Sequence, residues 1–295
     1  KLLLSIIFIL AISIASGQDL EIYVSDAANF TSGPWKILKF DENGENPETF
    51  IQDSIVWPQD IVFLEDQDVV LISNLKQSGN ISKHDINTGQ YIEDFATGIN
   101  GPTRMKIGED DLLYVLQWYN GNNKVLRYAL DGTFVDEFTS TGVPQSIGID
   151  WDSEGNLYVS SYTGGYVQKF DPDGNDLGQF ISDNLAGPTN IWFNETGDLM
   201  VNDYNGGAVK RFSDGGEFME TYISGLSGPE GVAYFENGNM LLGNGGSSAV
   251  KMYDPDGNFM EDFIPSGSGG LITPNAVVIR DLTAVAVMEL RAEGN

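Results

Sequence analysis

A proline that precedes a short run of β-forming residues recurs along the chain at nearly constant intervals. The prolines are Pro58, Pro102, Pro144, Pro188, Pro229 and Pro274, at spacings of 44, 42, 44, 41 and 45 residues. In each of the first five units, the run after the proline leads into a turn rich in Gly, Asp and Asn and then a second apolar run. A third run, another turn and a fourth run follow, and the fourth run closes on an aromatic residue. Because these turn residues favour chain reversal, the repeat predicts four short antiparallel strands per unit.

Four antiparallel strands at this period indicate a β-propeller blade. The N-terminal part of the chain supplies only three such strands, EIYVSD, KILKF and ENPETFI, and the missing first strand is PNAVVIRD near the C-terminus. We therefore expect an all-β, six-bladed β-propeller of four-stranded antiparallel blades over residues 21–281, closed by the C-terminal strand that completes the first blade. A single blade cannot bury both of its faces, so the ring is expected to form one domain and to be monomeric.

The two ends of the chain lie outside this repeat. Residues 1–17, KLLLSIIFILAISIASG, combine one basic residue, an apolar run and a small-residue end. This pattern predicts a secretory signal peptide, and the apolar run is shorter than the ~20 residues that a membrane-spanning helix needs. We expect a secreted or periplasmic protein with no membrane span in the mature chain. Residues 282–295 are interpreted as a tail or linker.

Composition limits what the protein can do. The chain of 295 residues has 43 acidic and 15 basic residues, a formal net charge of −28, one histidine and no cysteine. Nucleic-acid binding needs clusters of Lys and Arg, so the sequence predicts no nucleic-acid partner. The lack of cysteine excludes disulfides and thiolate metal sites, and a single histidine excludes mechanisms that use two imidazoles. There is no phosphate-binding glycine loop and no recognisable serine nucleophile motif.

The repeat unit resembles the NHL-type repeat and the wider six-bladed superfamily. The resemblance rests on the pattern P-x-x-I-x-x-D, then G-N-L-Y-V, then V-x-K-F-D-x-D-G and a closing Phe, as in residues 144–180. This superfamily includes calcium-dependent lactonases and esterases of the gluconolactonase and paraoxonase type. The resemblance covers nearly all of the mature chain and implies the architecture, but one propeller fold serves many activities.

Positions that recur in every blade are interpreted as structural. Five blades carry a cation in the third strand, which we expect to pair with acidic residues at the surface, and every fourth strand carries an aromatic residue that should fill the core. His84 occupies the place of an aromatic residue in the equivalent strands and is predicted to pack there. The two Asp-Pro-Asp-Gly-Asn segments, 171–175 and 254–258, are predicted to be hairpin turns, since neither continues as a calcium-binding EF-hand loop.

Polar side chains that vary around the ring are better functional candidates. One set follows the prolines, another ends the second strands, and in a propeller both lie on the same face. A first interpretation brings carboxylates and amides together on the axis to bind Ca²⁺, which prefers oxygen ligands. The lactonase resemblance implies this arrangement in part, since the family pairs a Pro-Asn-Gly strand with a strand that ends in Asp. The candidate metal ligands are Asp26, Asn190, Asp203, Glu230 and Asn275. Arg104 would remove the need for a metal if it paired with Asp60 or Glu230.

A second interpretation makes the same face a recognition surface. Trp118, Tyr162 and Tyr204 occupy equivalent positions just beyond second strands, within WYNG, YTGG and YNGG. Exposed aromatic rings beside amides suit sugars or peptides, although these rings could equally cap the tops of the blades. Asp60 and Arg104 complete the candidate ligand-binding face.

The sequence therefore favours a binding or interaction module for an extracellular glycan, peptide or protein, with no required cofactor and no assigned catalytic residue. The alternative is a Ca²⁺-dependent lactone or ester hydrolase of the gluconolactonase type. The two hypotheses differ in what lies on the ring axis: a cluster of oxygen ligands in the enzyme, or Arg104 in its place.

Overall fold

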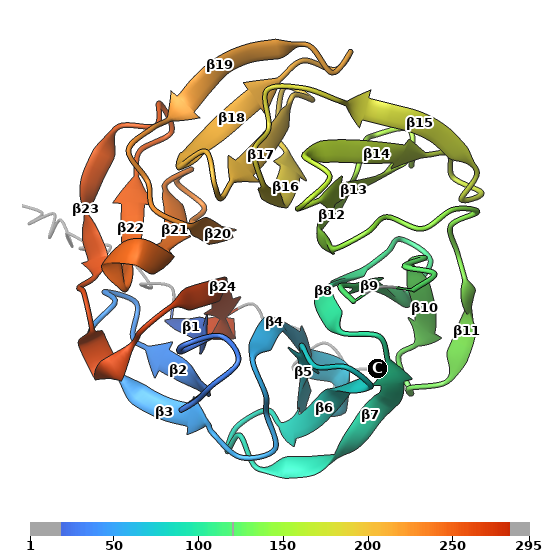
Figure 1. Ribbon diagram of the computed structural model, residues 1–295. Coiled ribbons are helices and arrows are strands. Elements are labelled where there is room, and N and C mark those ends of the chain that lie inside the picture. The colour runs from blue at the N-terminus through green and yellow to red at the C-terminus, as the bar shows by residue number, and fades with distance from the viewer. Residues whose placement is uncertain (1–18, 120, 284–295) are drawn as a thin grey trace, which may run out of the picture.

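The computed structural model describes residues 19–119 and 121–283. Within them, 24 strands form six four-stranded sheets arranged as a ring, and hydrogen-bonded neighbours follow one another along the chain in five of the six (Figure 1). This is the six-bladed β-propeller that the repeat predicts, so the predicted fold class is confirmed. The predicted signal segment 1–17 and the tail beyond residue 283 lie outside the described residues.

The first blade is built from both ends of the chain, as predicted. Strand β24 pairs antiparallel with β1, so that Leu20 lies opposite Asp281 and Val24 lies opposite Val277. This ladder joins the last part of the ring to the first and closes the circle through hydrogen bonds.

Each blade runs from an innermost first strand to an outermost fourth strand. Blade one consists of β24 (Pro274–Asp281), β1 (Leu20–Asp26), β2 (Lys36–Phe40) and β3 (Glu48–Ile51). Blade two consists of β4 (Pro58–Leu64), β5 (Val69–Asn74), β6 (Gly79–Asp85) and β7 (Tyr91–Ile99). Blade three consists of β8 (Pro102–Ile107), β9 (Leu112–Gln117), β10 (Leu126–Ala129) and β11 (Phe134–Glu137).

The remaining three blades follow the same order. Blade four consists of β12 (Ser146–Trp151), β13 (Leu157–Ser161), β14 (Tyr166–Phe170) and β15 (Asp176–Ile181). Blade five consists of β16 (Pro188–Phe193), β17 (Leu199–Asp203), β18 (Ala208–Phe212) and β19 (Phe218–Ile223). Blade six consists of β20 (Pro229–Tyr234), β21 (Met240–Asn244), β22 (Ala249–Tyr253) and β23 (Phe259–Ile264).

Three of the connections among the described residues contain a short helical segment. Single 3₁₀ turns lie at η1 (Glu65–Gln67), η2 (Gly245–Ser247) and η3 (Ser268–Gly270). No helix among the described residues is long and apolar enough to cross a bilayer.

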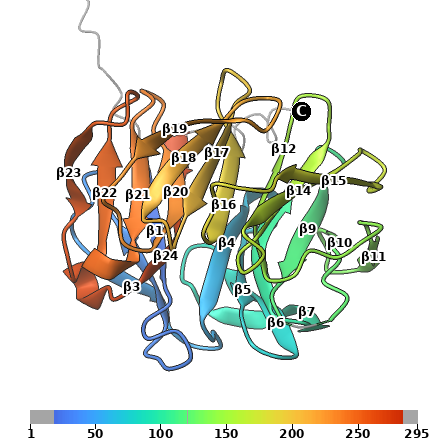
Figure 2. The same cartoon turned by 45° about the horizontal axis from the view of Figure 1, so that its top comes forward.

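The ring has two unlike faces, seen obliquely in Figure 2. The loop face carries the connections between blades, such as 182–187, and the loops between second and third strands, such as 27–35 and 162–165. The turn face carries the tight turns between first and second strands, such as 152–156, and between third and fourth strands, such as 171–175. These two names are used below.

The hydrophobic core is divided among the six contacts between neighbouring blades. One cluster, for example, joins Leu71 and Phe95 of blade two to Val115 and Tyr128 of blade three, and five similar clusters complete the circle. The predicted fourth-strand aromatics all lie in or against these clusters, where burial contributes up to roughly 1.5–3 kcal/mol for a side chain that is fully buried. They are Phe50, Phe95, Phe138, Phe180, Tyr222 and Phe263.

The other recurring positions also have structural roles. The third-strand cations form ion pairs with neighbouring carboxylates, as Arg127 does with Asp136. His84 is fully buried, and its ring nitrogens lie 3.1 Å from the Gly89 carbonyl oxygen and 2.9 Å from the Ser82 hydroxyl. Burial lowers the pKa of this imidazole. The prediction that His84 replaces a packed aromatic residue is therefore confirmed.

Candidate functional site

The polar residues that end the second strands share one role on the loop face. In each blade this side chain forms a hydrogen bond with the backbone of the connection that enters the same blade, and so satisfies groups that the turn leaves unpaired. Different side chains perform this task around the ring. They are Asp26, Asn74, Gln117, Ser161, Asp203 and Asn244.

Asp26 is fully buried and its carboxylate accepts three backbone N–H groups. Its Oδ1 atom lies 2.9 Å from the Ala28 nitrogen and 2.8 Å from the Thr273 nitrogen, and its Oδ2 atom lies 3.1 Å from the Ile272 nitrogen. Burial raises the pKa of this carboxyl, and the three backbone donors oppose the rise. The carboxylate therefore holds the connection that closes the ring.

Asp203 is equally buried and is engaged in the same way. Its Oδ1 atom accepts hydrogen bonds from the backbone nitrogens of Ala186 at 2.9 Å and Gly187 at 2.7 Å. Its Oδ2 atom lies 2.7 Å from Nζ of Lys210. A carboxylate with these partners has little capacity left for a metal ion.

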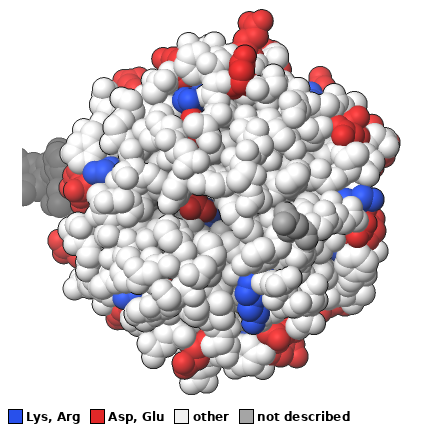
Figure 3. Space-filling model, in the orientation of Figure 1, with Lys and Arg blue, Asp and Glu red and all other residues white. Residues whose placement is uncertain are grey.

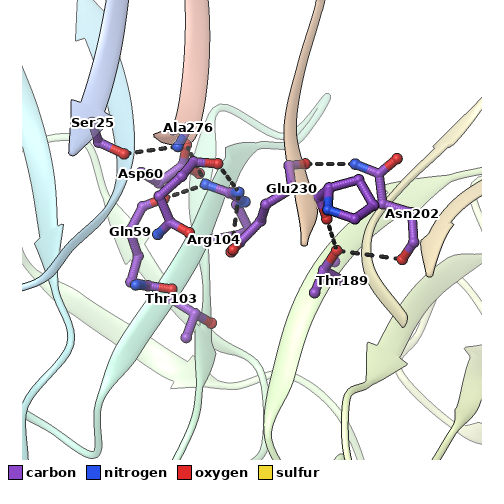
Figure 4. Close-up of polar contacts among 12 residues, drawn as sticks. Ser25, Gln59, Asp60, Thr103, Arg104, Thr189, Asn202, Glu230 and Ala276 are labelled. Atoms are coloured by element: carbon purple, nitrogen blue, oxygen red, sulfur yellow. Dashed lines mark hydrogen bonds and ion pairs between the residues drawn. The ribbon is translucent and has the colours of Figure 1, made fainter. Parts of the chain in front are cut away.

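A second polar group lies on the ring axis, where Arg104 of β8 enters from blade three (Figure 4). Its guanidinium donates to the Gln59 carbonyl oxygen and, at 2.8 Å, to the Asn275 carbonyl oxygen. It also lies 3.7 Å from Asp60 Oδ1 and 3.5 Å from Glu230 Oε1. One arginine thus connects four first-strand residues from blades one, two and six.

The axial group is almost completely buried, and this shifts its carboxyl groups. Burial raises the pKa of Asp60, although Arg104 and two backbone N–H groups oppose the shift. Burial, with a smaller contribution from Asp60, raises the pKa of Glu230 to about 7, against the lowering effect of Arg104. Glu230 therefore holds a proton at a higher pH than an ordinary carboxyl group does.

The predicted calcium ligands are only partly brought together. Glu230 and Asn275 both contact Arg104, and Asn190 lines the axial cavity of about 410 Å³ that Arg104 also lines. Asp26 and Asp203 are instead held in the connections of blades one and five. A guanidinium on the axis opposes a divalent cation there by charge repulsion.

Among residues 19–119 and 121–283, no group of three or more His, Cys, Asp or Glu side chains is arranged to hold a metal ion. Asn190, Asn275 and backbone carbonyl groups could still contribute oxygens, since Ca²⁺ accepts neutral ligands. The calcium hypothesis therefore stays a prediction, with fewer carboxylates available to it than the sequence suggested.

The three predicted aromatics form a continuous row on the loop face, from blade three to blade five. The rings of Trp118 and Tyr162 are 5.5 Å apart between centroids, and those of Tyr162 and Tyr204 are 5.9 Å apart. All three side chains are partly exposed. The Tyr162 hydroxyl donates to Asn205 Oδ1 at 3.1 Å, which adds an exposed amide to the row. We call Trp118, Tyr162, Tyr204 and Asn205 the aromatic row.

Asp60 and Arg104, which were expected beside these rings, do not join the aromatic row. Their side chains are only 13% and 6% exposed and face each other on the axis. Sequence reasoning also missed Asn205, although it lies within the YNGG segment that gave Tyr204. A second pair of rings, Phe30 and Trp57 at 5.6 Å, was missed as well because no repeated position signals it.

The loop face carries little charge. The connections and loops that form it contain two exposed acids, Asp53 and Asp183, and two partly exposed cations, Lys76 and Lys124, whereas most acidic residues lie in the turns of the opposite face or on the outer strands. In Figure 3 this face is mostly uncharged, with acidic and basic residues mainly around the rim, a basic patch between the centre and the lower rim, and a small charged group at the centre of the ring. The aromatic row therefore lies in a neutral, polar environment.

Comparison with solved structures confirms the architecture. A chain of a nidogen–laminin complex superimposes with a TM-score of 0.69 at 16% identity, over 89% of this chain and 98% of that chain. A protein of unknown function from Bacteroides caccae gives a TM-score of 0.69 at 13% identity, over 88% and 98%. A structure described as a gluconolactonase gives 0.58 at 18% identity, over 70% and 77%.

At such low identity these likenesses show the fold alone, a six-bladed β-propeller. No protein-family model and no curated protein matches the sequence. The chain is a six-bladed β-propeller.

Proposed function

We propose that this protein is a recognition module that acts outside the cytoplasm and binds an extracellular glycan, peptide or protein on its loop face. The observation that carries the proposal is the aromatic row, in which three partly exposed rings from three successive blades touch one another. A surface of this kind offers apolar contact area at low conformational cost, together with adjacent hydrogen-bonding groups.

The neutral surroundings favour an uncharged ligand, and a glycan chain fits them best. Sugar rings present apolar C–H faces that pack on aromatic rings, and hydroxyl groups that bond to amides. Asn205 supplies such an amide, and the loops beside the row are rich in Gly, Asn and Thr. A charged ligand would find few opposite charges on this face.

Three further points support the proposal. The N-terminal pattern in residues 1–17 favours export, which would place the loop face in contact with extracellular material. One structural neighbour is a nidogen–laminin complex, so a propeller of similar shape takes part in a protein assembly. The buried Arg104 on the axis also favours binding over metal-dependent hydrolysis, because its positive charge opposes a divalent cation there.

The proposal is tested by screening the mature protein on glycan and peptide arrays. We expect a hit that the Trp118→Ala and Tyr204→Ala variants each weaken at least tenfold, since truncating a central aromatic contact costs more than about 1.4 kcal/mol. Trp57→Ala serves as the matched control, because Trp57 is an aromatic residue of the loop face outside the row. A hit that survives Trp118→Ala unchanged, or that Trp57→Ala weakens equally, would remove the aromatic row as the binding site.

A further inference from the structure

A groove of about 770 Å³ lies on the turn face between blades five and six, opposite the aromatic row. Its walls come from the ends of β16 and β20 and from the turns that follow them. Trp192, Tyr222, Tyr234 and Phe235 line it, and Pro255 closes one side. The groove is thus an aromatic-walled surface on a side of the ring that has no role in the function proposed above.

Two of these aromatics are held in place by a direct contact between the blades. Trp192 donates its indole N–H to the Tyr234 hydroxyl at 2.9 Å, and the two ring centroids are 6.3 Å apart. Tyr234 is nevertheless 45% exposed. The structure therefore fixes a pair of large aromatic rings in an orientation that leaves one of them open to solvent.

The charged groups of the groove are unbalanced. Glu195 and Glu236 line it, are exposed, and make no hydrogen bond or ion pair with other described residues. Arg211 is the cation among the lining residues, and it is already engaged by Asp198 and by Glu220. Two free carboxylates thus face a groove whose one guanidinium is neutralised.

The surroundings reinforce this imbalance. The turns of this face carry acidic residues in all six blades. The neighbouring pocket between blades four and five has one cation, Lys169, which pairs with Asp152, and three further acids, Glu154, Glu195 and Asp214. A negative field of this extent attracts cations and raises the rate at which they arrive. Aromatic walls add cation–π attraction at short range, and arginine is the side chain that uses both best.

We propose that the turn-face groove binds a basic peptide segment of a partner protein, in which arginine side chains stack on Trp192 and Tyr234 and pair with Glu195 and Glu236. Apolar residues between the arginines would cover the remaining ring surface. This gives the protein a second binding face, independent of the aromatic row.

The experiment uses two fluorescein-labelled peptides and measures binding to the mature protein by fluorescence anisotropy at physiological salt. One peptide alternates arginine with leucine, and in the other citrulline replaces every arginine, which keeps the shape and removes the charge. We expect the arginine peptide to bind and the citrulline peptide to bind at least about tenfold more weakly. Equal binding of both peptides, or no binding of the arginine peptide, would overturn the proposal.

Charge-matched variants separate a site from diffuse attraction to an acidic protein. The double variant Glu195→Gln/Glu236→Gln should weaken the arginine peptide by about tenfold, because it removes both groove carboxylates. The control Glu42→Gln/Asp66→Asn removes two exposed charges from the turns of blades one and two on the same face, and should leave binding within about twofold. If both double variants weaken binding equally, the attraction is diffuse and the groove is not a site.

Tyr234→Ala tests the aromatic part independently of charge, and we expect it to weaken the arginine peptide about fivefold or more. Trp118→Ala, on the opposite face, should have no effect on this peptide. Unchanged binding by Tyr234→Ala would contradict the stacking contact. Failure of this proposal would leave the array result for the loop face unaffected, so the two can be judged separately.

Discussion

The guanidinium of Arg104 lies 3.5 Å from the carboxylate of Glu230 on the axis of the ring. The two residues come from blades three and six, and both are almost fully buried. Asp60 lies on the other side of the same guanidinium, at 3.7 Å. One cation thus compensates two buried acids, and its removal would leave Asp60 with only the weaker attraction of Lys106 and Glu230 without a nearby cation among the described residues.

Replacing Arg104 with methionine, which has a similar length and no charge, should destabilise the protein by about 3–5 kcal/mol at pH 8. The cost arises because Asp60 and Glu230 would remain buried as unpaired carboxylates. At pH 5 both can take up a proton more readily, so the loss should be smaller. Urea unfolding of both proteins at the two pH values measures the difference.

Lys124→Met is the matched control for this substitution. Lys124 lies 3.6 Å from Glu137 in an exposed ion pair, and such pairs contribute at most about 1 kcal/mol. A loss for Arg104→Met that is as small as that of the control, or that does not depend on pH, would contradict the role assigned to Arg104.

Glu230 should make the stability of the protein fall as the pH rises from about 4.5 to about 7. Its pKa is about 7 in the folded protein and 4.5 in the reference state. Between these values the folded state binds a proton that the unfolded state has lost, so unfolding becomes easier with increasing pH. The stabilising effect of this proton is complete below the lower pKa and is lost as the pH passes the higher one.

The Glu230→Gln variant removes this titration and tests it directly. Relative to the variant, the wild-type free energy of unfolding should decrease by about 3 kcal/mol across the interval, with a limiting slope of about 1.4 kcal/mol per pH unit. Urea titrations at half-unit steps of pH give both curves. Parallel curves would show that Glu230 does not titrate in this range.

The fold could be predicted from the sequence because its signals repeat. The prolines that open the first strands and the aromatics that close the fourth strands recur in phase, so the repeats agree on where strands begin and end. Closure by β24 followed from counting strands at the two ends. These features depend on the local sequence of each blade and on which side of its strands is buried. A repeat protein shows that local pattern in several copies, so the pattern can be recognised.

The site was harder to predict, because variation around the ring does not by itself mean function. Asp26, Asn74 and Ser161 differ in chemistry, yet each satisfies the backbone of a neighbouring connection. Any side chain with a suitably placed oxygen performs this task, so the position tolerates exchange. The sequence shows the residue types but not which backbone groups lie within reach.

The aromatic row was predictable as three equivalent positions, whereas the contact between its rings was not. Neighbouring blades bring these positions close together, and the rotamers of Trp118 and Tyr162 then decide whether the rings touch. The groove on the turn face was not predicted. The Tyr234 position is also aromatic in three other blades, as Phe63, Trp151 and Phe193, so it reads as a recurring structural position. Trp192 has no aromatic counterpart at the equivalent position of the other blades.

Asp203 should tolerate replacement by asparagine and not by alanine. Asn74 and Asn244 fill the equivalent position in other blades, so Asp203→Asn keeps the acceptor for Ala186 and Gly187 and loses the ion pair with Lys210, at a cost of about 1 kcal/mol. Asp203→Ala leaves two buried N–H groups without an acceptor and should cost about 3 kcal/mol. Chemical unfolding measures both, and equal losses would refute the capping role.

Calcium provides a separate test of the hydrolase hypothesis. Because Asp26 and Asp203 are already engaged by backbone N–H groups and Arg104 lies on the axis, we expect titration calorimetry with millimolar CaCl₂ to give no stoichiometric binding to the mature protein. Binding that Asp203→Asn weakens would establish the metal site and favour the hydrolase.

A glycine in the turn between β14 and β15 fixes the contact between blades three and four. Gly174 has a positive φ of 79°, and a Cβ atom at this position would lie 2.2 Å from the backbone oxygen of Phe138, in the outer strand region of blade three. Similar glycines approach the fourth-strand carbonyl of the preceding blade elsewhere in the ring, as Gly216 does with Phe180. The close approach allows neighbouring blades to pack without a gap.

Gly174→Ala should therefore lower the free energy of unfolding by about 3 kcal/mol, part from the backbone conformation and part from the displaced contact between the blades. Gly178→Ala separates the two contributions, because Gly178 also has a positive φ, of 93°, but no atom lies within 4 Å of its added Cβ. The control should lose only about 1 kcal/mol, the cost of the backbone conformation. Thermal and urea unfolding of the two variants give this difference, and equal losses would show that the approach of Gly174 to Phe138 does not limit the packing of the ring.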